Sequence, residues 1–338
     1  MAKYKDLVGT AVTNYAGNNP GVVEGELWYD SSNYAWKYQF PSVTTTGSWA
    51  TLTSLNTARD QIAGAGSTTS ALVFGENFGG ETELWNGSTW TEKNDLNTSR
   101  RALAGAGASG TAALAFGGNL AAPSPNASTA VTETWNGTNW TEVNDLNQQR
   151  SFLTGTGTNT AALAVGGSTG SGGNPPITDE NESWNGTNWT EVGDLNSARN
   201  ALGLGGTTTS ALAFGGSGPT AATESWNGSA WTEVADLNTA RLALKGSGSA
   251  NTDAVAFGGN QPPPNSALTE VWNGTAWTEQ GDLSNARKYL ASTKGSSTAA
   301  LAMGGGSSTN VESFTGAGAA VGAWSTGTSL NTARESMF

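Results

Sequence analysis

The sequence predicts an all-β propeller built from four-stranded blades. A phrase of the form Leu-Asn-x-x-Arg, once varied to Leu-Ser-Asn-Ala-Arg, recurs along the 338 residues at spacings of 41, 50, 49, 42, 46 and 47 residues. Each interval holds four β-type runs and shows no helical periodicity. A period in the forties fits a four-stranded propeller blade and is too long for ankyrin-type or leucine-rich repeats.

The four runs of each unit, called strands a to d, follow one order. Strand a is rich in small residues, as in ALAGAGASG, and therefore fits the crowded centre of the ring. Strand b is apolar and ends in glycine, as in ALAFGG at 113–118. Strands c and d form a hairpin around Asn-Gly with tryptophan on both sides, and Asn-Gly readily adopts the positive φ angles of a tight primed turn.

The two ends of the chain decide how the ring closes. Residues 60–327 supply six full repeats, and residues 25–59 add a hairpin of GELWYD and AWKYQF and a further strand-d phrase. We therefore expect one propeller over residues 25–338, with seven blades. Its composite closing blade takes strands b, c and d from residues 25–59 and strand a from residues 328–338.

The alternative is six blades plus an N-terminal β-hairpin. In that arrangement Trp49 and Trp324 compete for a single place in strand d. In both arrangements residues 1–24 form a separate N-terminal segment, which we interpret as a candidate attachment arm.

The recurrent arginine is interpreted as structural, because a residue present in every repeat usually serves the repeat. A glutamate lies one or two residues before the strand-c aromatic of each unit, and arginine can pair with it in a fork and tie neighbouring blades. The arginines are Arg59, Arg100, Arg150, Arg199, Arg241, Arg287 and Arg334, and the glutamates are Glu83, Glu133, Glu182, Glu224, Glu270 and Glu312.

Two other repeated residue types are also interpreted as structural. The paired tryptophans hold the same place in every blade, which favours inter-blade core over sugar-stacking platforms. The aspartate after strand d is expected to hydrogen-bond its own backbone in an Asx-type turn. One aspartate per blade does not supply the clustered oxygen ligands of a calcium loop.

Composition excludes several kinds of chemistry. The chain has no cysteine and no histidine, so disulfides, thiol chemistry and imidazole ligands are out. A net charge of −12 makes nucleic acid a poor partner. Apolar runs stay well short of the roughly 20 residues of a membrane span, so we expect no membrane insertion. We also expect no signal peptide, no cofactor, no metal site and no catalytic site.

The connections between strands b and c vary most from blade to blade. Alternate connections of a blade emerge on one face, so these b–c loops should cluster beside the Leu-Asn-x-x-Arg turns. Loops on a rigid scaffold usually carry binding specificity; neutral insertion is the other interpretation. The candidate binding residues are Asn119, Asn126, Asn174, Asp179, Glu180, Gln261 and Asn265.

These features carry a resemblance over residues 48–338. The Gly-Gly pairs such as Gly117-Gly118, the strand-c aromatic and the strand-d tryptophan resemble the kelch repeat. Two units depart from it, with FGEN at 74–77 and ESFTG at 312–316. The copper-oxidase type of kelch propeller needs histidine and cysteine, and the Asp-box motif of sialidases is absent.

The overall layout resembles kelch-like virion proteins of tailed, particularly marine, bacteriophages. The resemblance rests on a GELWYD-like hairpin followed directly by WNGTxWTE and LNTAR repeats. It implies a non-enzymatic structural or host-attachment protein of a tail or fibre, made in the host cytoplasm and placed in the virion in many copies. The N-terminal region would contact other virion proteins, and the loops would bind a host surface glycan or protein.

Two alternatives stay open. One is a bacterial carbohydrate-binding or adhesive propeller. The other is a glycan-cleaving enzyme, which needs two carboxylates about 5–10 Å apart on either side of a bond. Asp179, Glu180 and Asp253 are its only candidates.

Overall fold

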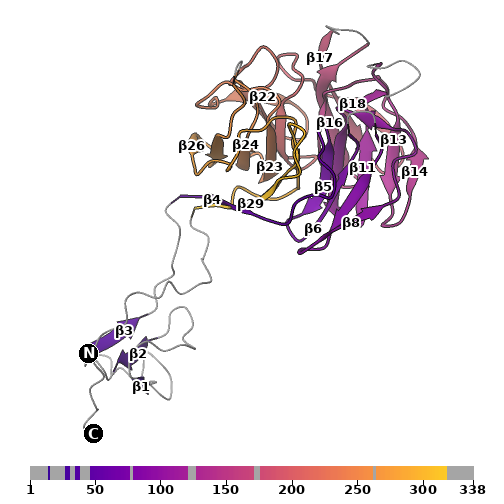
Figure 1. The fold of residues 1–338 in the computed structure, drawn as a ribbon. Helices are drawn as coiled ribbons and strands as arrows, with labels where there is room; N and C mark the ends of the chain where they lie inside the picture. Colours follow the sequence, from indigo (N-terminus) through magenta and orange to yellow (C-terminus); the bar gives the residue numbers. More distant parts are fainter. Residues whose placement is uncertain are drawn as a thin grey trace. The chain divides into compact units, whose positions relative to one another are not determined.

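The computed structural model contains a six-bladed β-propeller (Figure 1). It describes residues 14–15, 27–30, 35–38, 46–76, 79–120, 127–170, 176–261 and 264–317. The chain divides into two compact units, and the propeller unit comprises Thr46–Gly316. The described residues form no helix, so none of them provides a helix able to cross a membrane.

Each blade is a four-stranded antiparallel sheet in the order a, b, c, d. Blades 1 and 2 consist of β5 (Ala63–Ser67), β6 (Ser70–Phe74), β7 (Thr82–Trp85) and β8 (Trp90–Lys93), and of β10 (Ala104–Ser109), β11 (Ala112–Phe116), β13 (Thr132–Trp135) and β14 (Trp140–Val143). Blades 3 and 4 consist of β15 (Thr154–Gly157), β16 (Ala162–Ser168), β17 (Ile177–Trp184) and β18 (Trp189–Val192), and of β19 (Gly203–Gly206), β20 (Ala211–Phe214), β21 (Thr223–Trp226) and β22 (Trp231–Val234).

Blades 5 and 6 complete the ring. They consist of β23 (Lys245–Ala250), β24 (Asp253–Phe257), β25 (Thr269–Trp272) and β26 (Trp277–Glu279), and of β27 (Ala291–Ser292), β28 (Ala299–Met303), β29 (Val311–Thr315) and β4 (Ser48–Thr51). The strands a contact one another in the cyclic order β5, β10, β15, β19, β23, β27 and back to β5. The small residues of strand a therefore surround the axis, as the sequence predicts.

The prediction of seven blades with a composite seventh blade is wrong. β4 supplies strand d of blade 6 by pairing antiparallel with β29, in a register that sets Trp49 opposite Phe314. That pairing closes the ring at six blades. The predicted hairpin does form, from β2 (Leu27–Asp30) and β3 (Ala35–Tyr38), but it joins β1 (Asn14–Tyr15) in a separate three-stranded sheet.

The propeller is accordingly shorter than the expected 25–338. The strand a expected within residues 328–338 lies outside the described residues, as does nearly all of the segment 1–24. The alternative of six blades plus an N-terminal hairpin matches the described sheets.

Tryptophans fill the layers between blades. Trp140 of blade 2 packs on Phe74 of blade 1 with ring centroids 4.9 Å apart, and its Nε1 donates to Thr82 Oγ1 of blade 1 at 3.0 Å. The tryptophans of the Asn-Gly hairpins in blades 1 to 5 are all buried, with at most 7% of the residue exposed. Burial of both rings leaves no open aromatic face for a sugar to stack on.

Each junction between blades holds a buried arginine that follows strand d of one blade and reaches into the next. Arg150 follows β14, and its Nη2 donates to Glu182 Oε1 in β17 at 2.7 Å. Its Nη1 donates to the carbonyl oxygens of Gly166 and Glu180. Six such pairs, with N–O distances of 2.6 to 3.2 Å, join the six junctions: Arg59–Glu83, Arg100–Glu133, Arg150–Glu182, Arg199–Glu224, Arg241–Glu270 and Arg287–Glu312. Arg334 lies outside the described residues.

The second carboxylate oxygen is bonded by the asparagine position of the repeated phrase. Glu182 Oε2 accepts the backbone N–H of Asn147, which precedes Arg150 on the same turn, at 2.7 Å. The corresponding donors to the other glutamates are the backbone N–H groups of Asn56, Asn97, Asn196, Asn238 and Ser284. Each glutamate is thus held at both oxygens by the preceding blade, which compensates its burial.

Two expectations about turns need correction. In the c–d hairpins only the glycine, for example Gly137 at φ +94°, has positive φ. It occupies the first central position of the turn, as in type II′, while the Asn136 side-chain carbonyl accepts the N–H groups of Thr138 and Asn139. Asp145 does not form an Asx turn with its own backbone. Its Oδ1 accepts the N–H of Thr132, where strand c of the same blade begins.

The buried pairs predict strongly coupled substitutions. Arg150→Met should lower the free energy of unfolding by about 3–5 kcal/mol, because it leaves the Glu182 carboxylate buried without its charge partner. The double variant with Glu182→Leu should cost clearly less than the sum of the two single changes. Equilibrium urea unfolding measures this, with the exposed Glu191→Gln of the neighbouring strand as the control that should stay within about 0.5 kcal/mol. Additive effects of the two changes would contradict the coupling.

Ring closure by β4 predicts that the two competing tryptophans differ. Trp49 is half-buried against Phe257 and Phe314, so Trp49→Ala should lower the free energy of unfolding by about 2–4 kcal/mol. Trp324→Ala is the matched control and should leave the unfolding midpoint unchanged. The opposite ranking in thermal and urea unfolding would assign strand d of blade 6 to the C-terminal copy.

Candidate binding face

One face of the propeller gathers the d–a turns and the b–c loops. Backbone bridges join a turn to a loop at Arg59–Ser308, Ser151–Ser168 and Leu242–Asn260. In blade 2 the same contact becomes a two-stranded ladder between β9 (Arg100–Arg101) and β12 (Asn119–Leu120). We call this side, bearing all the b–c loops, the loop face.

The b–c connection of blade 3 extends farther than its counterparts. β16 and β17 continue pairing beyond Val165–Asn181 to Ser168–Ile177, so the two strands form an arm past the body of the blade. Figure 1 shows β17 reaching beyond the neighbouring strands. Ile177 near the tip is 46% exposed, the one large apolar side chain among the described residues that stands out into solvent.

The arm is braced by the loop of blade 2. The N–H and hydroxyl of Ser128 both donate to the carbonyl oxygen of Gly170, the hydroxyl at 2.7 Å. On the other side, Asn200 Nδ2 donates to Ser168 Oγ. These bonds hold the arm from both neighbouring junctions, so Ile177 is presented on a fixed support.

The predicted binding residues are not equivalent in the structure. Asp179 and Glu180 lie half-buried in the arm, and their carbonyl oxygens accept bonds from Leu195 and Arg150, while burial raises the pKa of the Glu180 carboxyl. Asn119 is 5% exposed and belongs to the β9–β12 ladder, which removes it from the outer surface. Gln261 is half-buried and Asn265 is exposed, whereas Asn126 and Asn174 lie outside the described residues.

The mouth of the central channel opens on the loop face and was missed by sequence reasoning. The second residue after each arginine has φ between +50° and +56°, although none is glycine: Gln61, Ala102, Phe152, Ala201, Ala243 and Tyr289. At five junctions the N–H of this residue donates to the carbonyl of its counterpart in the preceding junction, at 2.7 to 2.9 Å. A chain of backbone hydrogen bonds therefore runs around the mouth from Gln61 to Tyr289 and holds these strained positions.

Two large side chains cover this mouth. Phe152 and Tyr289 stand three junctions apart, on opposite sides of the ring, and their ring centroids approach to 5.8 Å. Burial and the negative charge of Asp60 raise the pKa of the Tyr289 hydroxyl. The sequence does contain a signal for this mouth: two units have an aromatic residue at a position that is alanine or glutamine in the other four.

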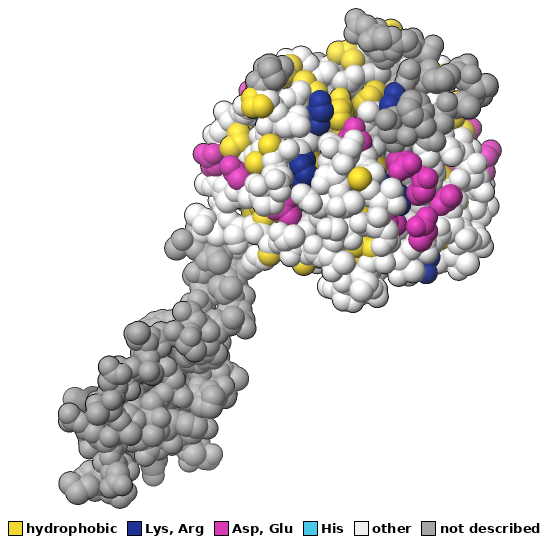
Figure 2. Space-filling view, in the orientation of Figure 1, with side chains coloured by type: hydrophobic (Ala, Val, Ile, Leu, Met, Phe, Trp, Pro, Cys, Tyr) yellow, Lys and Arg dark blue, Asp and Glu magenta, His cyan; other side chains and the backbone are white. Residues whose placement is uncertain are grey.

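The acidic candidates for glycan cleavage do not meet. Asp179 and Glu180 lie on the loop face, whereas Asp253 begins strand b of blade 5 at the opposite face, where Ser249 and the Ser297 N–H bond its carboxylate and lower its pKa. Among the described residues, no three acidic side chains gather closely enough to hold a metal ion. In Figure 2 acidic side chains form groups on the propeller surface and basic ones are scattered singly.

Comparison with known proteins supports the fold. No family model and no curated protein matches the sequence. A solved structure described as that of YjhT is similar, with a TM-score of 0.64 and 12% identity, covering 79% of this chain and 96% of that chain. At this identity the likeness shows the fold alone.

The backbone strain at the mouth predicts an unusual effect of glycine. Ala201→Gly should leave the free energy of unfolding unchanged or raise it by about 0.5–1 kcal/mol, since glycine adopts positive φ without a steric cost. Ala112→Gly, at a half-buried strand position without positive φ, should lower it by a similar amount. Urea unfolding of both variants checks the pair, and equal losses would contradict the strain.

Proposed function

We propose that this chain is a non-enzymatic binding protein that contacts its partner through the loop face. The observation that carries the proposal is the contrast between a uniform scaffold and one variable face. The six junctions repeat the same arginine–glutamate pair, whereas the b–c loops differ, and one forms a braced arm with exposed Ile177. Variable loops on a rigid scaffold are the usual site of recognition.

We further propose that the protein belongs to the virion of a tailed bacteriophage. The resemblance to kelch-like virion proteins supports this assignment. So does the division of the chain into the propeller and a second unit with its own three-stranded sheet, to which we assign the contact with other virion proteins. Many copies per particle would strengthen a weak contact of each loop face through avidity.

The partner in this proposal is a glycan or protein on the host surface. A bacterial adhesive or carbohydrate-binding propeller would use the same face. The two proposals differ only in whether a phage particle or a bacterial cell carries the protein. Antibody labelling of phage particles from cultures that contain the gene separates the two. Labelled tails or fibres support the virion assignment, and label confined to bacterial cells overturns it.

Binding through the loop face predicts a face-specific loss. Fluorescently labelled chain, multimerised on beads, should bind cells of a panel of marine bacteria or an array of their surface polysaccharides. Ile177→Asp should reduce that binding at least tenfold, while Thr138→Asp, at an exposed c–d turn on the opposite face, should not change it. Equal loss in both variants, or no binding by the unaltered chain, would contradict the proposal.

A further inference from the structure

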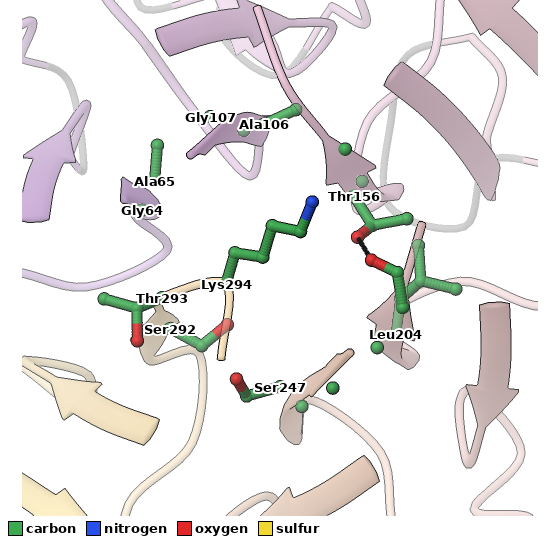
Figure 3. A pocket seen from close by; sticks show the side chains of 17 residues that line it. Gly64, Ala65, Ala106, Gly107, Thr156, Leu204, Ser247, Ser292, Thr293 and Lys294 are labelled. Carbon is green, nitrogen blue, oxygen red and sulfur yellow. Dashed lines mark hydrogen bonds between the residues drawn. The ribbon is translucent and has the colours of Figure 1, made fainter. Parts of the chain in front are cut away.

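The central channel carries two lysines that break the repeat of small residues. Lys245 begins β23 at a position that is alanine, threonine or glycine in the other five units. Lys294 follows β27 at a position that is glycine in the other five units. Both side chains line the channel, and Figure 3 shows Lys294 extending across it between strands of different blades.

The channel is a succession of three small cavities along the axis. The first lies below Phe152 and Tyr289, the second is shared by Lys245 and Ser292, and the third is lined by Ser247 and Lys294. Their volumes are about 30, 20 and 40 Å³. Each has room for a few water-sized groups and is too small for a sugar ring.

The charge of this channel is one-sided. No carboxylate lines any of the three cavities within the described residues, although the whole chain carries a net charge of −12. The other titratable groups there are Lys294 and Tyr289. Burial alone lowers the pKa of Lys245 to about 8, with no acidic neighbour to oppose it. Lys245 and Lys294 are both half-buried, and an ammonium group that loses part of its hydration without a nearby counter-charge is costly to keep.

A further polar group lines the third cavity. Ser247 lies two residues after Lys245 on β23, so the two side chains leave the strand on the same side. It is 2% exposed, and its Oγ has no hydrogen-bond partner among the described residues. Figure 3 shows Ser247 and Lys294 among the side chains around the third cavity, with the Lys294 ammonium pointing toward Ala106 and Thr156. A buried hydroxyl normally has a partner, which points to an occupant.

We propose that the channel binds small anions of the size of chloride, nitrate or formate, attracted by Lys245 beside its first two cavities and by Lys294 and the Ser247 hydroxyl beside the third. The ammonium groups supply the counter-charge, and Ser247 donates its hydrogen. Phe152 and Tyr289 cover the channel on the loop face. The anion therefore neutralises charge inside the ring and takes no part in recognition by the loops.

The site also predicts a dependence on pH. The anion binds the protonated form of Lys245, so binding raises the pKa of that lysine above about 8. Affinity should therefore be nearly constant below pH 7 and should weaken by up to about tenfold per unit as pH rises beyond 8.

The experiment is a titration of the full chain with sodium chloride, nitrate, formate or phosphate at constant ionic strength, balanced with gluconate. Binding is read from the broadening of the ³⁵Cl NMR signal, from its reversal by the competing anions, and from the rise in melting temperature. We expect chloride broadening that competing small anions reverse, and the ranking of the four anions shows whether halide or oxyanion is preferred.

Variants assign the site. Lys245→Met should weaken binding at least tenfold, and Lys294→Met and Ser247→Ala should weaken it severalfold. Lys93→Met on outer strand β8 is the matched control, with the same change of charge and no effect expected. Melting curves of each variant without added anion verify folding. Equal affinity in all variants, or no binding of any of the four anions below about 100 mM, would overturn the proposal.

Discussion

The propeller depends on the buried ion pair that joins each blade to the next. The hydrogen-bonded ladder of each sheet ends at strand d, so neighbouring blades are joined by side chains and by single backbone hydrogen bonds of the turns and loops. The arginine and asparagine of one turn cross that boundary and bind both oxygens of a single glutamate, as Arg150 and Asn147 do with Glu182. Such a network imposes one spacing and one register between blades, which apolar packing alone would leave looser.

The same network explains why so much of the fold could be predicted from sequence. The arginine, the glutamate and the hairpin tryptophans recur because each blade must meet its neighbour in the same way. The spacing of these residues along the chain therefore gives the length of one blade directly. The count of blades was mispredicted because the chain carries one more strand-d phrase than there are places. Local pattern does not state whether Trp49 or Trp324 pairs with β29, since that choice depends on contacts more than two hundred residues apart.

The candidate sites were harder to predict because their residues are not repeated from blade to blade. Sequence variation located the b–c loops, yet it did not show that Asn119 is buried in a ladder or that Ile177 tops a braced arm. The channel residues were hidden because Lys245 and Lys294 lie in runs that otherwise read as featureless small residues. A residue of strand a that differs from its counterparts in the other units, as Lys245 does, is therefore also a signal for a candidate site.

Closure of blade 6 has a consequence for biosynthesis. β4 leaves the ribosome before any blade is made, and its partner β29 leaves after five blades are complete. The earliest strand of the ring must therefore wait, with an unpaired edge, until almost the whole chain has been translated. During that interval β29-like edges of other nascent copies are competing partners, so a cell making many copies at once favours slow, well-spaced translation or a chaperone that shields residues 46–52.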